Sequence, residues 1–186
     1  MRTKLTTLLL CLSAYWCFGQ SDKDKGWDLP NGFRAGYQWS NLVKDGESAA
    51  DNLDGFYAGY VRKFRLLHLL KVETGLEYMT AGAQQTEDTK LQLHYLVVPA
   101  EAAVKLGPFV GMAGLSANFK VGEKYTENGQ EIDREDKANS FDTAANVGAG
   151  FNFFILMLEA RYYWGLTDVQ DGWKNQYWQL GLKLHF

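Results

Sequence analysis

Residues 177–186, YWQLGLKLHF, alternate between two kinds of side chain at every position after the first. The apolar set is Trp178, Leu180, Leu182, Leu184 and Phe186, and the residues between them are Gln179, Gly181, Lys183 and His185. A period of two is typical of a β-strand whose two faces meet different surroundings. Because chain ends normally fray in water, a strand this regular is expected to be paired along its whole length.

Seven other stretches show strand-like patterns, and no long helical period competes with them. They are 33–42, 55–65, 69–82, 91–106, 108–119, 143–154 and 155–166. In most of them large apolar residues alternate with small, polar or charged ones, although the pattern in 55–65 leaves its inward face open. The sequence therefore predicts an all-β domain of eight strands.

The connections between these strands alternate in length. Tight connections fall near 65–68, 106–108 and 153–156, and long polar ones at 43–54, 83–90, 120–142 and 167–176. This order predicts an antiparallel up-and-down barrel with all long loops at one end and both termini at the other. Outer-membrane barrels share this asymmetry, with short periplasmic turns and long outer loops.

Two kinds of barrel could bury strands of this pattern. A soluble barrel turns its apolar face inward, whereas a membrane barrel turns it toward lipid and fills its lumen with polar groups. The strands here reach about 10 residues or more, as a tilted membrane strand requires, whereas strands of globular proteins average about 5–6. Strand length therefore favours a transmembrane barrel.

Charges of both signs recur on the face opposite the apolar one. They are Lys71, Glu73, Glu77, Glu101, Lys105, Glu159, Arg161 and Lys183. The interior of an eight-stranded barrel is just wide enough for side chains to fill it, so we expect these charges to pair as a lumen network, because a lone buried charge is costly. The alternative is a solvated face of a soluble sheet.

Tyrosine and tryptophan gather near the predicted strand ends. The residues are Tyr37, Trp39, Tyr57, Tyr60, Tyr78, Tyr95, Tyr162, Tyr163, Trp164, Tyr177 and Trp178. These amphipathic rings suit the aromatic girdles at the two membrane–water interfaces. Packing in an ordinary aromatic core is the alternative.

The first nineteen residues read as a secretory signal peptide. Arg2 and Lys4 precede the mostly apolar run 5–18, and Gly19 suits a cleavage site. The run is shorter than the ~20 residues of a spanning helix. Both cysteines lie within 1–19, so the domain 20–186 would hold no disulfide or thiol nucleophile. Subtracting the two cations of the leader from the net charge of −3 leaves −5, which argues against a nucleic-acid partner.

Several stretches resemble the PorT-like outer-membrane β-barrel family of Bacteroidetes-type bacteria. They are TGLEYMTAG (74–82), YLVVPAEAAVKLGPFVGMAG (95–114), LEARYYWGLTDV (158–169) and the ending GLKLHF (181–186). The resemblance implies the barrel fold and an outer-membrane location. Val97 departs from the family pattern, because an acidic residue is frequent there. No residue carries over the secretion and gliding role of the family's namesake.

We expect no catalytic, cofactor-binding or metal site. His68, His94 and His185 are too scattered to share a metal ion. A lipid-modifying hydrolase would need an assembly such as His94 with Ser116 or Ser140. Glu159 and Arg161 fit an interior salt bridge better than a proton-transfer pair.

The predicted protein is thus a monomeric outer-membrane barrel with a filled lumen and a structural or surface-binding role. Its expected partners are outer-membrane lipid and lipopolysaccharide, a protein at the outer loops, and the barrel-assembly machinery. That machinery would read the aromatic ending formed by Trp178, Leu180, Leu182, Leu184 and Phe186. The alternatives are an accessory part of a secretion or envelope-assembly machine, a lipid-modifying enzyme and a soluble periplasmic ligand-binding barrel.

Overall fold

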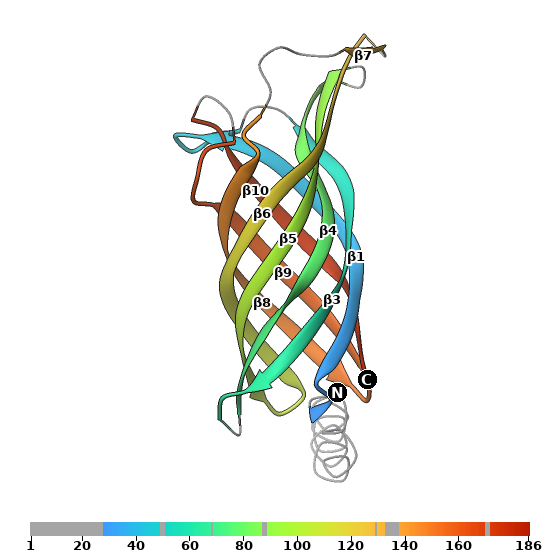
Figure 1. The fold of residues 1–186 in the computed structure, drawn as a ribbon, viewed down its shortest axis with the longest axis vertical. Coiled ribbons are helices and arrows are strands. Elements are labelled where there is room, and N and C mark those ends of the chain that lie inside the picture. The colour runs from blue at the N-terminus through green and yellow to red at the C-terminus, as the bar shows by residue number, and fades with distance from the viewer. Residues whose placement is uncertain are drawn as a thin grey trace, which may run out of the picture.

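The computed structural model describes residues 28–48, 51–67, 69–86, 89–128, 130–132, 138–169 and 172–186. Nearly all of them are in strands (Figure 1). The strands are β1 Asn31–Lys44, β2 Glu47–Ser48, β3 Asp51–Arg65, β4 Leu70–Thr86, β5 Thr89–Leu106, β6 Phe109–Glu127, β7 Gln130–Ile132, β8 Phe141–Phe153, β9 Leu156–Gly165 and β10 Lys174–His185. In the part of the chain described, no helix is long and apolar enough to cross a membrane.

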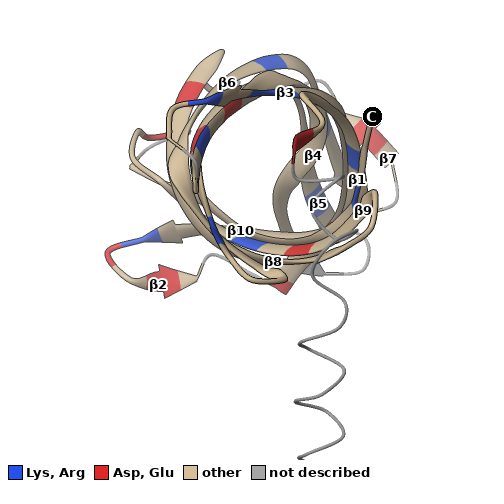
Figure 2. Cartoon of the chain, turned by 90° about the horizontal axis from the view of Figure 1, so that it is seen from below, with Lys and Arg blue, Asp and Glu red and all other residues tan. Residues whose placement is uncertain are grey.

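The eight long strands close into an antiparallel barrel, which confirms the predicted fold class. Each pairs with the next long strand along the chain, and β10 pairs with β1 from Gly32↔His185 to Val43↔Lys174. Viewed along its axis, the wall forms a complete ring (Figure 2). Closure leaves neither β1 nor β10 with a free edge inside the barrel wall, which explains why β10 is regular to its end.

One end of the barrel carries the start of β1, the end of β10 and three tight turns; we call it the terminal end. The turn after β3 is closed by hydrogen bonds from the amides of Leu66 and Leu67 to the carbonyl of Leu70. The turn between β5 and β6 holds Gly107 at φ +66°, and the turn between β8 and β9 holds Phe154 at φ +56°. All three turns fall where the sequence predicts short connections.

The opposite end, which we call the hairpin end, corrects three predicted loops. Within 43–54, residues 43–44 belong to β1, 47–48 to β2 and 51–54 to β3. Residues 83–90 are mostly strand, because β4 and β5 stay paired up to Thr86↔Thr89. Within 120–142, β6 continues to Glu127 and then pairs with β7. Figure 1 shows these hairpins standing well beyond the rest of the wall. The lipid-facing apolar pattern stops here but backbone pairing does not, since the ladder needs no membrane.

The two faces of the wall differ as the membrane arrangement requires. Side chains such as Leu76 and Leu182 are about half exposed on the outside (53% and 54%), whereas their neighbours Glu77 and Lys183 are buried in the lumen. The face left open for 55–65 is now settled, because Tyr57 and its fellow inward residues in β3 are buried. An exposed apolar band of this extent is expected to contact lipid.

Four of the eleven residues assigned to aromatic girdles lie inside the barrel instead. They are Tyr57, Tyr95, Tyr163 and Tyr177, each no more than 2% exposed. A tyrosine is long enough to span a narrow lumen, and its hydroxyl can satisfy buried polar groups there. The other seven are partly or largely exposed. The predicted signal peptide, 1–19, lies outside the described residues and stays a prediction.

Candidate functional site: the filled lumen

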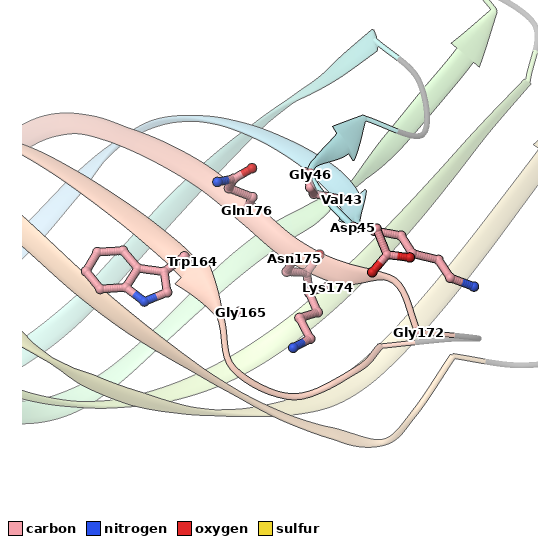
Figure 3. A pocket seen from close by; sticks show the side chains of 10 residues that line it. Val43, Asp45, Gly46, Trp164, Gly165, Gly172, Lys174, Asn175 and Gln176 are labelled. Atoms are coloured by element: carbon pink, nitrogen blue, oxygen red, sulfur yellow. The ribbon is translucent and has the colours of Figure 1, made fainter.

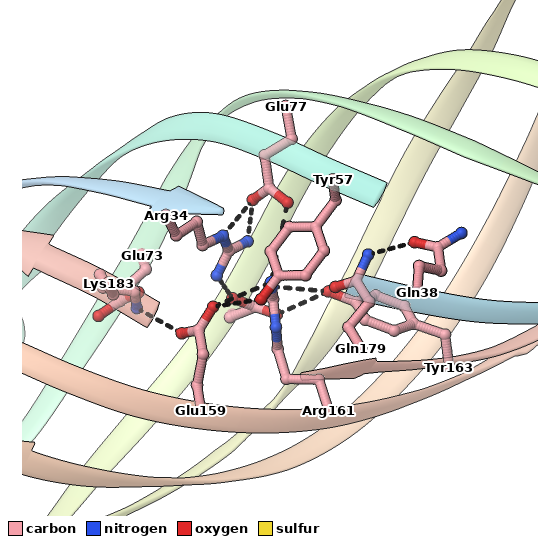
Figure 4. Close-up of polar contacts among 11 residues, drawn as sticks. Arg34, Gln38, Tyr57, Glu73, Glu77, Glu159, Arg161, Tyr163, Gln179 and Lys183 are labelled. Carbon is pink, nitrogen blue, oxygen red and sulfur yellow. Dashed lines mark hydrogen bonds and ion pairs between the residues drawn. The ribbon is translucent and has the colours of Figure 1, made fainter. Parts of the chain in front are cut away.

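Two arginines form the centre of the lumen. Arg34 of β1 donates from Nε to Glu77 Oε1 at 2.5 Å and from Nη1 to Glu101 Oε2 at 2.7 Å. Arg161 of β9 approaches Glu159 Oε1 with Nη2 at 3.1 Å and Glu101 Oε1 with Nη1 at 3.3 Å. Figure 4 shows both guanidinium groups between carboxylates from different strands. The contacts therefore link opposite sides of the wall.

Two tyrosines complete this central cluster. Tyr57 donates its hydroxyl to Glu159 Oε1 at 3.2 Å, and its ring lies 5.0 Å from the Arg161 guanidinium carbon. Tyr163 accepts from Arg161 Nη1 at 2.9 Å and donates to Glu101 Oε1 at 3.1 Å. The rings occupy space that charges alone would leave empty, and their hydroxyls add bonds that buried carboxylates need.

A lysine layer lies between the central cluster and the terminal end. Lys183 Nζ donates to Glu73 Oε2 at 2.6 Å and approaches Glu159 Oε2 at 3.4 Å. Lys71 Nζ donates to Asp28 Oδ1 at 3.1 Å, and Asp28 also accepts from Arg65. Partial burial tends to raise the pKa of Asp28, but the hydrogen bonds and charges of Lys71 and Arg65 outweigh it and lower that pKa.

The described part of the lumen nearer the hairpin end has fewer charges: Asp142 is buried there, and closer to the rim Lys120 pairs with Glu123 at 2.6 Å. Asp142 accepts hydrogen bonds from the amides of Asn118 and Asn175, the latter at 2.9 Å. Lower down, Gln179 donates to Gln38 at 2.6 Å, and Gln38 donates to the carbonyl of Thr80 at 2.9 Å. Polar partners therefore continue along the barrel axis well beyond the charged centre.

Apolar side chains close over this polar stretch at the hairpin end. Val169, from the connection between β9 and β10, is fully buried in one apolar cluster with Leu42, Leu91 and Ala138, and Trp173 packs against this cluster. Two backbone hydrogen bonds hold the connection there: Asn139 donates to the carbonyl of Val169, and Val169 to that of Trp173, both at 2.7 Å. The loops thus supply a cap over the lumen.

Seven of the eight charges predicted to face the lumen are buried there: Lys71, Glu73, Glu77, Glu101, Glu159, Arg161 and Lys183. The eighth, Lys105, is at the end of β5 and only partly buried. Sequence reasoning left out Arg34, which holds two of the carboxylates. Its place between Phe33 and Ala35 in an alternating stretch is the signal that could have found it.

The histidines do not form a catalytic or metal-binding arrangement in the described residues. His94 Nδ1 lies 2.5 Å from the Tyr78 hydroxyl on the outer side of the wall, where Tyr78 also packs against the exposed Phe56. Ser116 is buried in the lumen, so the wall separates it from His94. His185 is buried at the terminal end. His68 lies outside the described residues, and no group of three metal-ligating side chains occurs in the remainder.

The outer row of β10 forms one exposed apolar face. Its members are Trp178, Leu180, Leu182, Leu184 and Phe186, each more than 40% exposed. Phe186 stacks on Phe33 of β1 with ring centroids 5.2 Å apart. The amide of Phe186 also donates to the carbonyl of Asn31 at 3.1 Å.

Comparisons with known proteins agree with this geometry. The attachment invasion locus protein Ail of Yersinia pestis, solved with the heparin analogue sucrose octasulfate, is 21% identical, with a TM-score of 0.53 over 85% of this chain and 99% of that one. Neisserial surface protein A is 12% identical, with a TM-score of 0.57 over 84% and 97%. At these identities the likeness concerns the fold. No curated protein matches the chain.

A family model described as an outer membrane protein beta-barrel domain matches residues 32–171. That range runs from the start of β1 into the connection before β10, so it covers seven of the eight long strands. The chain therefore belongs to the outer membrane protein β-barrel domain family, whose location is the outer membrane.

Proposed function

We propose that this protein is a sealed, non-catalytic, monomeric scaffold that presents its hairpin end at the cell surface to bind ligands or partner proteins. Within the family, the PorT-like group is the one we propose. The lumen carries the proposal: side chains cross it at the lysine layer, the central arginine cluster and the apolar cap. A barrel filled in this way suits a scaffold better than a general pore.

The projecting hairpins supply the binding surface. Beyond the closed wall, β4, β5, β6 and β7 extend as a sheet with exposed apolar residues such as Val121 and Ile132 (56% and 42% exposed). Its surface charges include Lys124 and Glu131, 3.7 Å apart and both exposed. Exposed sheet edges and apolar side chains on a rigid base are features of recognition surfaces.

The attachment protein Ail supports a surface-binding role, because its name concerns attachment and its structure holds a heparin analogue. A role in adhesion or surface binding is therefore the form of the proposal that we favour. We also propose that the barrel-assembly machinery recognises the outer row of β10. If the protein that binds the hairpin end belongs to a secretion or envelope-assembly machine, this barrel is an accessory component of that machine.

Site-specific photo-crosslinking in intact cells tests the proposal. A photoreactive amino acid replaces Val121 on the projecting sheet, and in a matched control it replaces Leu115, an exposed residue of the same strand that faces lipid. We expect specific protein or polysaccharide adducts from position 121 and none from 115. Equal adduct patterns from both positions, or none from position 121, would overturn the surface-binding role.

A further inference from the structure

A polar pocket of about 320 Å³ opens at the hairpin-end rim, away from the projecting sheet. The turn between β1 and β2 forms one side, and the connection into β10 forms the other (Figure 3). Pairing of Val43 with Lys174 brings these distant segments together. The pocket is therefore built by barrel closure.

The chemistry of the pocket favours an anion with hydroxyl groups. Lys44 and Lys174 supply ammonium groups, while Asp45 supplies a carboxylate and Gln176 an amide, whose nitrogen donates to Tyr162. Asn175 lines the pocket with its backbone, because its side chain donates to Asp142 in the lumen. Two ammonium groups against one carboxylate leave a net positive charge in the lining. This combination suits a phosphate, which accepts from lysine, attached to a sugar, whose hydroxyls bond amides and carboxylates.

Glycine at position 172 leaves room for one of the two lysines. Gly172 has φ +83°, and a Cβ there would stand 3.2 Å from Lys44 Cε and 3.4 Å from its Nζ. A larger residue would therefore be strained and would also crowd the amine. The absence of a side chain at Gly172 therefore leaves space for Lys44 at the pocket.

Aromatic residues place the pocket at the level of lipid head groups. Trp164 lines it and packs near Tyr162, with centroids 6.1 Å apart, and Tyr162 packs against Trp178 at 4.7 Å. In β1, Tyr37 and Trp39 lie 4.8 Å apart, and Trp39 is opposite Trp178. Such a belt marks the membrane–water interface, so a ligand in the pocket would sit where outer-leaflet head groups lie.

We infer that this rim pocket binds the phosphorylated sugar head group of an outer-leaflet glycolipid. Lys44 and Lys174 hold the phosphate, the Gln176 amide oxygen and the Asp45 carboxylate accept from the sugar hydroxyls, and Trp164 packs against the sugar ring or the first acyl carbons. The site is separate from the hairpin surface. The inference rests on the proposed orientation of the hairpin end toward the cell exterior, but it does not depend on the partner-binding role.

Native mass spectrometry of the full-length protein, purified in detergent and titrated with lipid A carrying both phosphates, tests the site. We expect a single retained lipid A per barrel. Replacing both lysines, Lys44→Gln with Lys174→Gln, should weaken retention about tenfold or more, as loss of charged hydrogen bonds predicts. The matched control, Arg62→Gln with Lys105→Gln, removes two cations near the terminal end of β3 and β5 and should bind as wild type does.

Three further probes separate the sources of the signal. Dephosphorylated lipid A and phosphatidylglycerol should bind more weakly than lipid A with both phosphates, and inorganic phosphate alone should not compete at equal concentration. Unchanged binding by the Lys44→Gln, Lys174→Gln variant, or equal retention of dephosphorylated lipid A, would overturn the inference. A heat-dependent shift in gel mobility confirms that each variant is folded before it is compared.

Discussion

Arg161 shows how a single residue can both fill and stabilise the lumen. It is fully buried, contacts Glu101 and Glu159, and packs against the ring of Tyr57. Such a cluster gains little net stability over an apolar core, but removing one member leaves uncompensated buried charge. Removing Arg161 therefore costs more free energy of unfolding than its ion pairs contribute in the wild-type protein.

Replacing Arg161 by glutamine should lower the free energy of unfolding by about 3–5 kcal/mol, because the surrounding carboxylates lose a buried cation. Urea unfolding in lipid vesicles, followed by tryptophan fluorescence, measures the change. Arg62→Gln on the exposed face of β3 is the control and should stay within about 0.5 kcal/mol of wild type. Similar unfolding of the two variants would contradict a stabilising role for the network.

Gly181 illustrates close approach inside the wall. A Cβ at this position would meet the Tyr57 hydroxyl and the backbone carbonyl of Ala35. Gly111, on the outer side of β6, has nothing within 4 Å of the corresponding position. Glycine therefore has different significance in these two strands.

We predict that Gly181→Val lowers stability by about 1–3 kcal/mol or prevents closure, as overpacking usually does, whereas Gly111→Val is close to neutral. The fraction of heat-modifiable protein after refolding in detergent reports both outcomes. Equal refolding of the two valine variants would show that Tyr57 moves aside without cost.

Among the elements, β10 has two faces with different tasks. Its inner residues Gln179 and Lys183 bond across the lumen, and its outer row contacts lipid and ends on Phe186. We propose that the outer row is also read during assembly. Stability and assembly should therefore respond to different substitutions in the same strand.

Phe186→Ala should reduce the amount of protein in the outer membrane several-fold while leaving refolding in detergent nearly unchanged. Quantitative immunoblotting of membrane fractions, beside a refolding assay, separates the two effects. Phe154→Ala, an exposed aromatic in the turn after β8, serves as control. If both variants reach the membrane at the wild-type level, Phe186 is not an assembly signal.

For the whole molecule, the asymmetry of the two ends predicts its orientation. Tight turns lie at the terminal end and projecting hairpins at the other. Because both native cysteines fall in the predicted leader, a cysteine introduced elsewhere would be unique. Val121→Cys should react with a membrane-impermeant maleimide on intact cells, and Phe154→Cys should react only after lysis. The reverse labelling pattern would show that the hairpin end faces the periplasm.

The filled lumen also predicts electrical behaviour. Purified protein inserted into a planar bilayer should show no steady conductance, because the central cluster and the apolar cap both cross the ion path. Loss of the cap alone, through Val169→Gly, should leave the bilayer silent as long as the arginines remain. Stable single-channel steps from wild-type protein would refute the sealed scaffold.

Local patterns in the sequence were enough to predict the eight strands, the barrel and most lumen charges. Alternation is a property of a single strand, so Glu77 and Lys183 reveal their face from their neighbours alone. The same reasoning wrongly assigned Tyr57, Tyr95, Tyr163 and Tyr177 to the aromatic girdles, because an aromatic ring suits either face of the barrel wall. It also ended β4 and β6 too early, because strands that pair beyond the membrane need no row of apolar residues on their outer face.

Local sequence patterns could not predict which residues contact one another across the lumen and around the rim. The pairing of Arg34 with Glu77 and Glu101 depends on how the sheet curls around the lumen, and the presence of Lys44 and Lys174 in one pocket depends on the register between β1 and β10. Which face a residue occupies is local, because backbone geometry repeats every two residues. Which residue it meets is a property of the closed sheet, because strand tilt and register bring together groups far apart in the chain.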